Sequence, residues 1–428
     1  VYERYGFEPL ETPAVENIET LMGKYGEEGN QLIFKILKRG VHESTGEADL
    51  ALRYDLTVPL ARVVAEYRDK LPKVFKRYQI QPVWRADRPA RGRFREFYQC
   101  DVDVLGSRSM VVEAEICAAV SDVLTKLGFE DFTILLNHRE VLEKIMTVQG
   151  VDPSQLGDAF TVWDKLDKIG VAGARREWED REIYLGAYDD LIELLYHDLG
   201  ELRTEFRNGD NENWNEDMLE RFPMAMGDSE EAHANQGLDE LSRILEYAGR
   251  TSARGKIRLA PNLARGLSYY TGTIMEIKVE GMPSLGGGGR YDNLVGMFLG
   301  KDVPACGFSL GLERIIVVMT ERGMFPADLV SSPADVMVTI WNEDSMNESI
   351  ALAHELRATG LRVDLYPDAD KMGKQFKYAS SRGIQFVAVL GDDERARGEV
   401  AIKNMRSGEQ RSVNRAEVAE ELRKEKHS

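Results

Sequence analysis

The first 136 residues mix short helical and short strand-like patterns of hydrophobic positions. Apolar side chains recur at helical spacing in three segments, and the shorter apolar runs between them are typical of strands. The predicted helices cover 16–26, 56–67 and 109–127, and the predicted strands cover 31–37, 50–54, 78–85 and 95–105. The last two strands predict a hairpin whose long polar loop, 87–93, is of a kind that often carries function.

The pattern is helical in the middle of the chain and returns to strands after it. Helices are predicted at 141–146, 191–199 and 238–247, strands at 257–259, 273–279 and 304–309, a glycine run at 286–289 and a further helix at 310–320. We therefore expect one α+β domain, an antiparallel sheet flanked by helices, built from residues 1–136 and 251–325. Residues 137–250 are expected to form a helical insertion domain.

A separate domain is expected at the C-terminal end. Residues 324–334 hold two prolines and a serine pair, which is typical of a linker. After it come predicted strands at 336–340, 361–366, 386–390 and 399–404 and predicted helices at 347–358, 371–382 and 416–424. This regular alternation predicts an α/β domain over residues 333–428.

Charge is distributed unevenly, which changes what the net charge of −18 implies. Residues 177–240 carry 20 acidic side chains and four arginines, so this segment accounts for −16 and the rest of the chain for −2. Residues 73–95 carry eight basic side chains and one acidic side chain. A phosphate-bearing ligand would be attracted to this basic stretch, although a solvated basic face has the same composition.

Several classes of protein are excluded by what the sequence lacks. Its composition, 43% hydrophobic and 30% charged, is that of a globular protein rather than a collagen-like, disordered or disulfide-rich one. No apolar run approaches the ~18 residues of a membrane span, and we expect no signal peptide. The three cysteines, Cys100, Cys117 and Cys306, form no paired spacing, which favours the reducing cytoplasm.

Common nucleotide, metal and hydrolase motifs are also missing. The sequence has no P-loop, no G-x-G-x-x-G, no His-Glu-x-x-His helix and no G-x-S-x-G turn. If this chain binds a nucleotide, arginines and backbone groups must therefore hold it.

Two polar constellations lie in the first part of the chain. Asp55 and Thr57 follow a predicted strand and precede a predicted helix, where a carboxylate could bind an ammonium group or simply cap the helix. In the hairpin, alternation puts Gln99, Asp101 and Asp103 on one face of a strand. Three polar side chains on an internal strand favour a ligand site, whereas on an edge strand they would only face water.

Two further constellations lie after the insertion. Residues 262–272 hold Arg265, Tyr269 and Tyr270 between glycines, which suits a planar polar ligand or a turn with core aromatics. Arg314 lies at a predicted strand-to-helix junction in 307–315, where it could hold a phosphate or lie exposed on an ordinary helix.

In order and spacing, these four constellations resemble the histidyl-tRNA synthetase family of class II aminoacyl-tRNA synthetases. The resemblance runs from about residue 7 to residue 424. Its segments are the second class II motif at 78–106, the histidine-specific stretch at 263–276, the third motif at 307–314 and an anticodon-binding segment at 371–379. Many family members have an acidic residue where this chain has Ser268, which bears on how the tyrosine pair is supported.

The resemblance implies a class II catalytic domain and a two-step reaction. Histidine attacks the α-phosphate of ATP, with Mg²⁺, and the histidyl-adenylate is passed to the 3′ end of tRNA(His). Arg85 and Arg265 would be catalytic, because fixed guanidinium groups stabilise charge on phosphate oxygens. The implied ATP-binding residues are Arg85, Arg93, Arg265 and Arg314, and the implied histidine-binding residues are Asp55, Thr57, Gln99, Asp103, Tyr269 and Tyr270.

The resemblance also implies partners. The lysines Lys371, Lys374 and Lys377 would contact the tRNA from the C-terminal domain, and no protein motif for a metal is present. A homodimer is expected because Thr12-Pro13-Ala14 stands in the position of the family's interface motif.

Three other proteins would share part of this pattern. They are a regulatory paralogue such as the synthetase-like subunit of ATP phosphoribosyltransferase, a tRNA-sensing module of a stress kinase, and a class II synthetase for threonine, proline or glycine. The C-terminal domain and the retained arginines count against the first two. The 263–270 stretch counts against the third.

Overall fold

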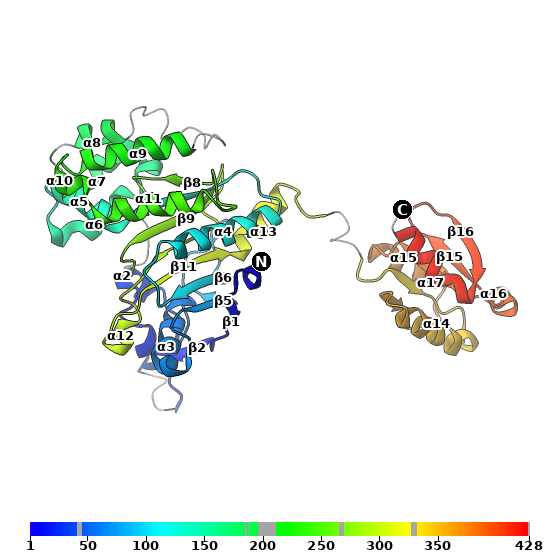
Figure 1. Ribbon diagram of the computed structural model, residues 1–428. Helices are drawn as coiled ribbons and strands as arrows, with labels where there is room; N and C mark the ends of the chain where they lie inside the picture. The colour runs from blue at the N-terminus through cyan, green and yellow to red at the C-terminus, as the bar shows by residue number, and fades with distance from the viewer. Residues whose placement is uncertain are drawn as a thin grey trace. The chain divides into compact units, whose positions relative to one another are not determined.

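The structure, a computed structural model, describes residues 1–40, 45–184, 186, 188–195, 211–264, 269–326 and 332–426. The chain forms two compact units, Val1–Arg322 and Gly323–Ser428, each with its own sheet (Figure 1). None of the described helices combines the length and the apolar character of a membrane span.

The first unit is built on an eight-stranded sheet with the order β1-β5-β6-β11-β10-β9-β7-β8. Its strands are β1 Glu8–Pro9, β5 Phe75–Trp84, β6 Glu96–Leu105, β7 Phe132–His138, β8 Ile257–Leu259, β9 Thr273–Val279, β10 Gly286–Arg290 and β11 Ala305–Gly311. The pairs β1–β5 and β7–β8 are parallel, whereas all other neighbours are antiparallel. The expected antiparallel sheet is thus confirmed for most strand pairs, with one parallel pair near each edge.

A smaller sheet, β2-β4-β3, lies beside it with three helices. The elements are β2 Val15–Asn17, α1 Ile18–Leu21, α2 Gly26–Gln31, β3 Lys35–Leu37, β4 Ala48–Leu52 and α3 Thr57–Tyr67. The helix predicted over 16–26 is confirmed only as the single turn α1, Ile18–Leu21. Glu16 enters β2 and accepts two hydrogen bonds from Arg62, and Gly23 has a φ of 77°, which ends helical geometry.

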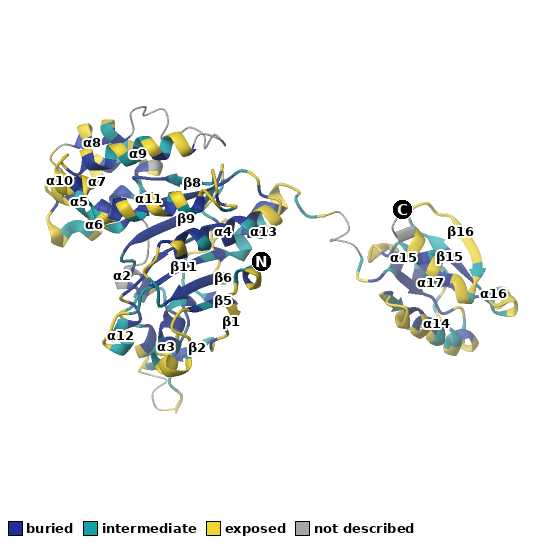
Figure 2. Cartoon of the chain, in the orientation of Figure 1, coloured by how far each residue is buried: buried dark blue, intermediate teal, exposed yellow. Residues whose placement is uncertain are grey.

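Helices cover the large sheet and bury its central strands (Figure 2). The covering helices are α4 Val111–Lys126, α11 Gln236–Ala248 and α13 Leu312–Glu321, and a short α12, Gly296–Leu299, lies before β11. α11 packs against α4 and β7, although its sequence falls inside the expected insertion. The expected boundary at residue 136 likewise falls inside β7, whose last residue is His138.

Between β7 and β8 the chain is helical. The helices are α5 Arg139–Val148, α6 Leu156–Trp163, α7 Leu166–Asp180, α8 Tyr188–Leu195, α9 Asn211–Ala225 and α10 Glu230–His233. α9 lies along the outer edge of β8. Asn215 donates to the carbonyl of Ile257 at 2.9 Å and accepts the N–H of Leu259 at 2.7 Å, and Trp214 donates to the carbonyl of Leu259 at 2.8 Å. Side chains thus satisfy the backbone of this edge strand.

The second unit has a five-stranded sheet with the order β13-β12-β14-β15-β16. Its elements are β12 Val336–Val338, α14 Met346–Ala358, β13 Val363–Leu365, α15 Met372–Ser381, β14 Phe386–Val389, α16 Asp392–Arg397, β15 Glu399–Asn404, β16 Gln410–Asn414 and α17 Val418–Lys426. β12 is parallel to β13 and β14, and β15 and β16 extend the sheet antiparallel. Sequence analysis missed β16 because its side chains are mostly polar and exposed.

Candidate active site

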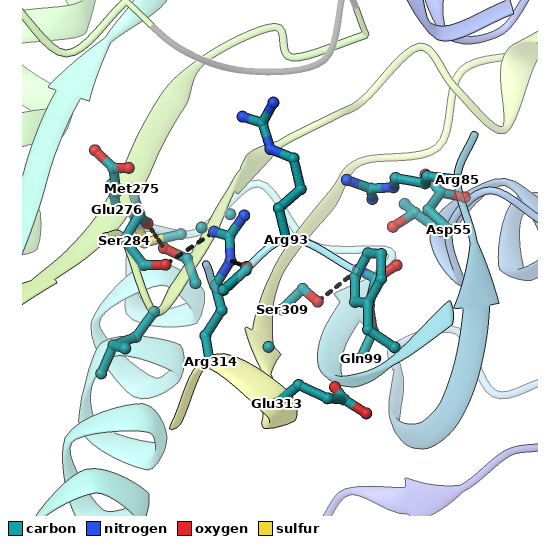
Figure 3. Close-up of a pocket in the computed structure, with 18 of the residues that line it drawn as sticks. Asp55, Arg85, Arg93, Gln99, Met275, Glu276, Ser284, Ser309, Glu313 and Arg314 are labelled. Carbon is teal, nitrogen blue, oxygen red and sulfur yellow. Dashed lines mark hydrogen bonds between the residues drawn. The ribbon is translucent and has the colours of Figure 1, made fainter. Parts of the chain in front are cut away.

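One cavity of about 340 Å³ lies over the central strands of the first unit (Figure 3). Eight of the residues singled out from the sequence line it: Asp55, Thr57, Arg85, Arg93, Gln99, Tyr269, Tyr270 and Arg314. They come from the start of α3, the β5–β6 hairpin, the segment before β9 and the start of α13. Asp55 and Arg85 lie on one side of the cavity and Arg314 on the other, with Arg93 between them (Figure 3). Arg265 and Ser268 lie outside the described residues.

Asp55 both caps a helix and faces the cavity. Its Oδ1 accepts the N–H of Val58 in the first turn of α3 at 3.0 Å and the hydroxyl of Tyr25 at 2.9 Å. Its Oδ2 accepts the hydroxyl of Tyr269 at 3.1 Å. Burial raises the pKa of Asp55, and the hydrogen bonds from Val58 and Tyr25 counteract that rise. The two readings of this aspartate, cap and ligand site, are therefore compatible.

Arg85 is fixed by the backbone and by aromatic rings. Its Nε donates to the carbonyl of Tyr54 at 3.1 Å, and its guanidinium lies 4.2 Å from the ring centre of Tyr54 and 5.1 Å from that of Phe97. Among the described residues, no protein atom accepts a hydrogen bond from its terminal nitrogens. Because Arg85 lines the cavity, those two nitrogens can donate to oxygens of a ligand there.

The three polar residues of β6 lie at different depths. Gln99 lines the cavity and donates to Ser309 Oγ at 2.6 Å. Asp101 and Asp103 are each 2% exposed and lie near the Arg77 guanidinium, at 3.6 and 2.8 Å. The edge-strand alternative is wrong, because β6 is paired on both sides.

Asp103 borders a second, smaller cavity of about 20 Å³, which also touches Tyr270 and Thr57. The Tyr291 hydroxyl donates to Asp103 Oδ1, and Arg77 lies against Oδ2. The two cavities share Tyr270 and Thr57 in their linings, so the small one lies behind the large one. Asp103 therefore lies at the deep end of the site rather than on the wall of the main cavity.

Burial sets the ionisation of the two aspartates. It raises the pKa of Asp101 to about 7, with the Arg77 guanidinium lowering it and the Asp103 carboxylate raising it. The pKa of Asp103 is also raised by burial, against the opposing effects of Arg77 and Tyr291. The floor of the site thus holds two interacting carboxyl groups against one guanidinium.

Arg314 joins the hairpin loop to the glycine-rich strand. Its Nε donates to the carbonyl of Gly92 at 2.9 Å and its Nη1 to the carbonyl of Ser284 at 2.9 Å (Figure 3). Two glycines are required by the close approach of the neighbouring strands β10, β11 and β6. A Cβ at Gly288 would lie 2.2 Å from the carbonyl oxygen of Gly307, and a Cβ at Gly307 would lie 1.9 Å from Asp103 Oδ1.

The basic stretch divides into structural and cavity-facing side chains. Arg77 is buried, Lys76 pairs with Glu115 at 2.6 Å, and Arg91 pairs with Glu321. Arg85 and Arg93 line the cavity instead, and Arg93 lies 3.9 Å from Asp87.

Three residues that shape the site were not singled out from the sequence: Tyr25, Arg77 and Tyr291. Tyr25 stood inside a segment predicted as one helix, so nothing marked its hydroxyl. Arg77 could have been found, because strand alternation and hairpin pairing place it directly opposite Asp103.

In the second unit the three lysines lie on the exposed side of α15. Lys371 lies just before the first residue of the helix and makes no capping hydrogen bond with its side chain, and Lys374 donates to Asp370 at 2.9 Å. Lys377 is also exposed.

No cluster of three or more His, Cys, Asp or Glu side chains able to hold a metal occurs in the described part of the chain. Four carboxylates line the main cavity, namely Asp55, Asp87, Glu276 and Glu313. Glu313 also accepts the N–H of Tyr98 at 2.8 Å. A hard cation would need oxygens from a ligand in addition to these.

The family model of histidyl-tRNA synthetase matches residues 1–315, and an anticodon-binding domain model matches residues 335–425. The histidine–tRNA ligase of Porphyromonas gingivalis is 41% identical, over 96% of this chain and 91% of the relative. That of Gloeobacter violaceus is 38% identical, over 96% of this chain and 90% of the relative.

Solved structures agree. The crystal structure of histidyl-tRNA synthetase from Nostoc sp. PCC 7120 has a TM-score of 0.77 at 31% identity, covering 99% of this chain and 93% of that one. An ATP phosphoribosyltransferase regulatory subunit/histidyl-tRNA synthetase from Bacillus halodurans has a TM-score of 0.68 at 21% identity, covering 91% and 90%. The second likeness shows the fold alone.

Proposed function

The chain belongs to the histidyl-tRNA synthetase family and charges tRNA(His) with histidine, and from this we propose that the 340 Å³ cavity is where histidine is activated by ATP. A carboxylate oxygen of histidine attacks the α-phosphorus of ATP, and pyrophosphate leaves. A ribose hydroxyl at the 3′ end of the tRNA then attacks the carbonyl carbon of the adenylate, and AMP leaves.

One observation carries the proposal: a single cavity is lined by a buried carboxylate, Asp55, and by three arginines, Arg85, Arg93 and Arg314. A zwitterionic amino acid and a triphosphate need these opposite charges within reach of one another. Holding both substrates together also supplies much of the rate enhancement that positioning can give.

We assign the histidine subsite to the side of the cavity where Asp55 lies. Asp55, Thr57 and Gln99 hold the α-ammonium group. The imidazole extends toward Tyr270 and Asp103, with Tyr269 behind. Asp103 accepts a hydrogen bond from one ring nitrogen, and the Tyr270 hydroxyl forms a hydrogen bond with the other. Both nitrogens of the imidazole are thus recognised.

We assign the phosphates to the arginines. Arg85 binds the α-phosphate, where negative charge grows as the new bond forms, and Arg314 binds the γ-phosphate, with Arg93 nearby. Arg265, by its position in the histidine-specific stretch, supports the carboxylate and the α-phosphate. Arg85 and Arg265 are the proposed catalytic residues.

Mg²⁺ fits this cavity as a companion of ATP. It is usually bound through one or two carboxylates together with substrate phosphates, and Glu276 and Glu313 are carboxylates of that kind here. When bound, the ion neutralises phosphate charge.

The first unit has the class II catalytic fold with a helical region, and the second is an α/β anticodon-binding domain. We propose the boundaries 1–136 and 251–325, 137–250 and 333–428 for the catalytic, insertion and anticodon-binding domains. The end of β7 and the helix α11 belong to the insertion by sequence but pack with the catalytic domain. We further propose that the enzyme works in the cytoplasm as a homodimer. Sedimentation showing only monomer at micromolar concentration, with full activity, would contradict the dimer.

ATP–pyrophosphate exchange tests the proposed reaction. Exchange should depend on histidine and not on threonine, proline or glycine. If no amino acid supports exchange while tRNA still binds, the cavity is not an activation site, and a regulatory or tRNA-sensing role is favoured instead.

A further inference from the structure

We propose that Tyr25 is a positioning residue for histidine, which acts by orienting the Asp55 carboxylate toward the substrate's α-ammonium group. The inference rests on the proposed role of Asp55. Tyr25 does not line the cavity, so any effect on histidine must pass through its neighbours, and its hydroxyl contacts Asp55.

Within the described part of the chain, Asp55 has one hydrogen-bond acceptor position left for a ligand. A carboxylate offers about four acceptor positions, two on each oxygen. Tyr25 and Val58 donate to Oδ1 at 2.9 and 3.0 Å, and Tyr269 donates to Oδ2 at 3.1 Å. Among the described residues these are its hydrogen-bond donors, so one position on Oδ2 is left for a ligand. Two tyrosine hydroxyls, one on each oxygen, fix the plane of the carboxylate and the direction of that position.

Tyr25 is built into the structure as a donor. It is 4% exposed, and burial together with the Asp55 carboxylate raises the pKa of its hydroxyl well above the usual range. The hydroxyl therefore stays protonated at working pH. Gly29 makes room for it, since a Cβ there would lie 2.4 Å from the Cβ of Tyr25.

The ring and the hydroxyl of Tyr25 have separable tasks. The ring lies 4.7 Å from the ring of Tyr54, which in turn carries the Arg85 guanidinium at 4.2 Å. Tyr25→Phe keeps this stack, and with it the ATP side of the cavity, and removes only the donor to Asp55. The variant should thus affect histidine and spare ATP.

Ionisation of Asp55 gives a second readout. The groups facing it are Tyr25, Tyr269 and Arg85, with Asp101 and Asp103 across the sheet. The Tyr25 hydrogen bond opposes the rise in pKa that burial causes. Without it, the carboxylate should protonate at higher pH. The acid limb of kcat/KM for histidine should therefore move to higher pH.

The experiment measures KM for histidine and for ATP separately in pyrophosphate exchange. Tyr25→Phe should raise KM for histidine about tenfold, the effect expected from one hydrogen bond to a charged group, with KM for ATP within twofold. Tyr5→Phe is the matched control, because Tyr5 donates to Asp122 at 2.9 Å and lies outside the cavity lining. It should change neither constant.

Asp55→Asn separates this inference from the proposed function. If it leaves KM for histidine unchanged, the assignment of Asp55 fails. If it raises that KM while Tyr25→Phe does not, only the role of Tyr25 is overturned. In the double variant Tyr25→Phe should add little, since its effect passes through Asp55. A further tenfold rise in KM for histidine in the double variant would contradict the proposal, as would a joint rise of KM for histidine and for ATP in Tyr25→Phe. Either result would mean that Tyr25 supports the fold in general.

Discussion

Arg77 and Asp103 form a buried ion pair across the β5–β6 hairpin, with Nη2 2.8 Å from Oδ2 and neither side chain more than 3% exposed. Arg77 also lies 3.6 Å from Asp101, so one guanidinium is shared by two carboxyl groups. Asp103, the proposed acceptor for the imidazole, is therefore held in place by Arg77, which does not line either cavity. Truncating Asp103 to alanine would leave the buried Arg77 guanidinium with only the more distant Asp101 as a partner, which would destabilise the fold.

Asp103→Asn should raise KM for histidine at least tenfold and leave KM for ATP within twofold. The amide keeps the shape but loses the charge that accepts from the imidazole N–H. Pyrophosphate exchange at varied histidine and varied ATP measures both constants. If they rise together, Asp103 supports the fold rather than reading the substrate.

Arg85→Ala should lower the rate of adenylate formation by about 10²–10³, the usual effect of losing one donor to developing charge. We expect the same for Arg265→Ala. Arg91→Ala is the matched control, since Arg91 lies on the same hairpin but pairs with the exposed Glu321. Exchange rates unchanged in both Arg85→Ala and Arg265→Ala would refute their catalytic assignment.

Asp101 should make stability fall as pH rises toward neutrality. Its pKa is about 7 when folded, against about 3.9 in an unfolded chain, so between these values the folded state holds the extra proton. The stabilisation is complete below about pH 4 and is lost as pH rises through 7. Relative to Asp101→Asn, the native chain should gain up to about 1.4 kcal/mol for each pH unit lowered within this range.

Urea unfolding of both proteins at pH 8, 7, 6 and 5 measures this difference. A gap in unfolding free energy that stays constant with pH would show that Asp101 keeps an ordinary pKa.

Lys374→Glu should weaken tRNA charging and leave pyrophosphate exchange intact, because activation takes place in the other unit. The side chain is exposed, and the reversal also places like charges at Asp370 and residue 374. Lys424→Glu, on α17 of the same unit, is the control. Charging should be measured at two salt concentrations. Unchanged charging would mean that these lysines form only a solvated face.

Elements with a clear hydrophobic pattern were predicted most accurately. β8, β9 and β15 lie where predicted, and α3 and α4 differ by one or two residues at their ends. The helix predicted over 16–26 is reduced to Ile18–Leu21, because Glu16 pairs with distant Arg62 and Gly23 has a left-handed backbone. The parallel pairing of β1 with β5 and of β8 with β7 was not predictable. Strand direction depends on connections that residue patterns do not encode.

The candidate site divides in the same way. Motif order located the cavity-lining arginines and tyrosines, because residue type and spacing carry that information. The sequence does not show how deep each side chain lies in the site. Asp103 and Gln99 share a face of β6, yet of these two only Gln99 lines the main cavity. Tyr25 had no motif, and only its 2.9 Å contact with Asp55 marks it.

The side chains of α9 that cover β8 have a consequence for association between molecules. A strand at the end of a sheet offers unpaired amide and carbonyl groups to any passing chain, and such edges nucleate aggregation. Asn215 and Trp214 occupy these groups on β8, so the eight-stranded sheet cannot lengthen by recruiting a strand from a neighbour there. Substitutions at Asn215 should therefore lower the solubility of the protein at high concentration before they alter the geometry of the cavity over the central strands.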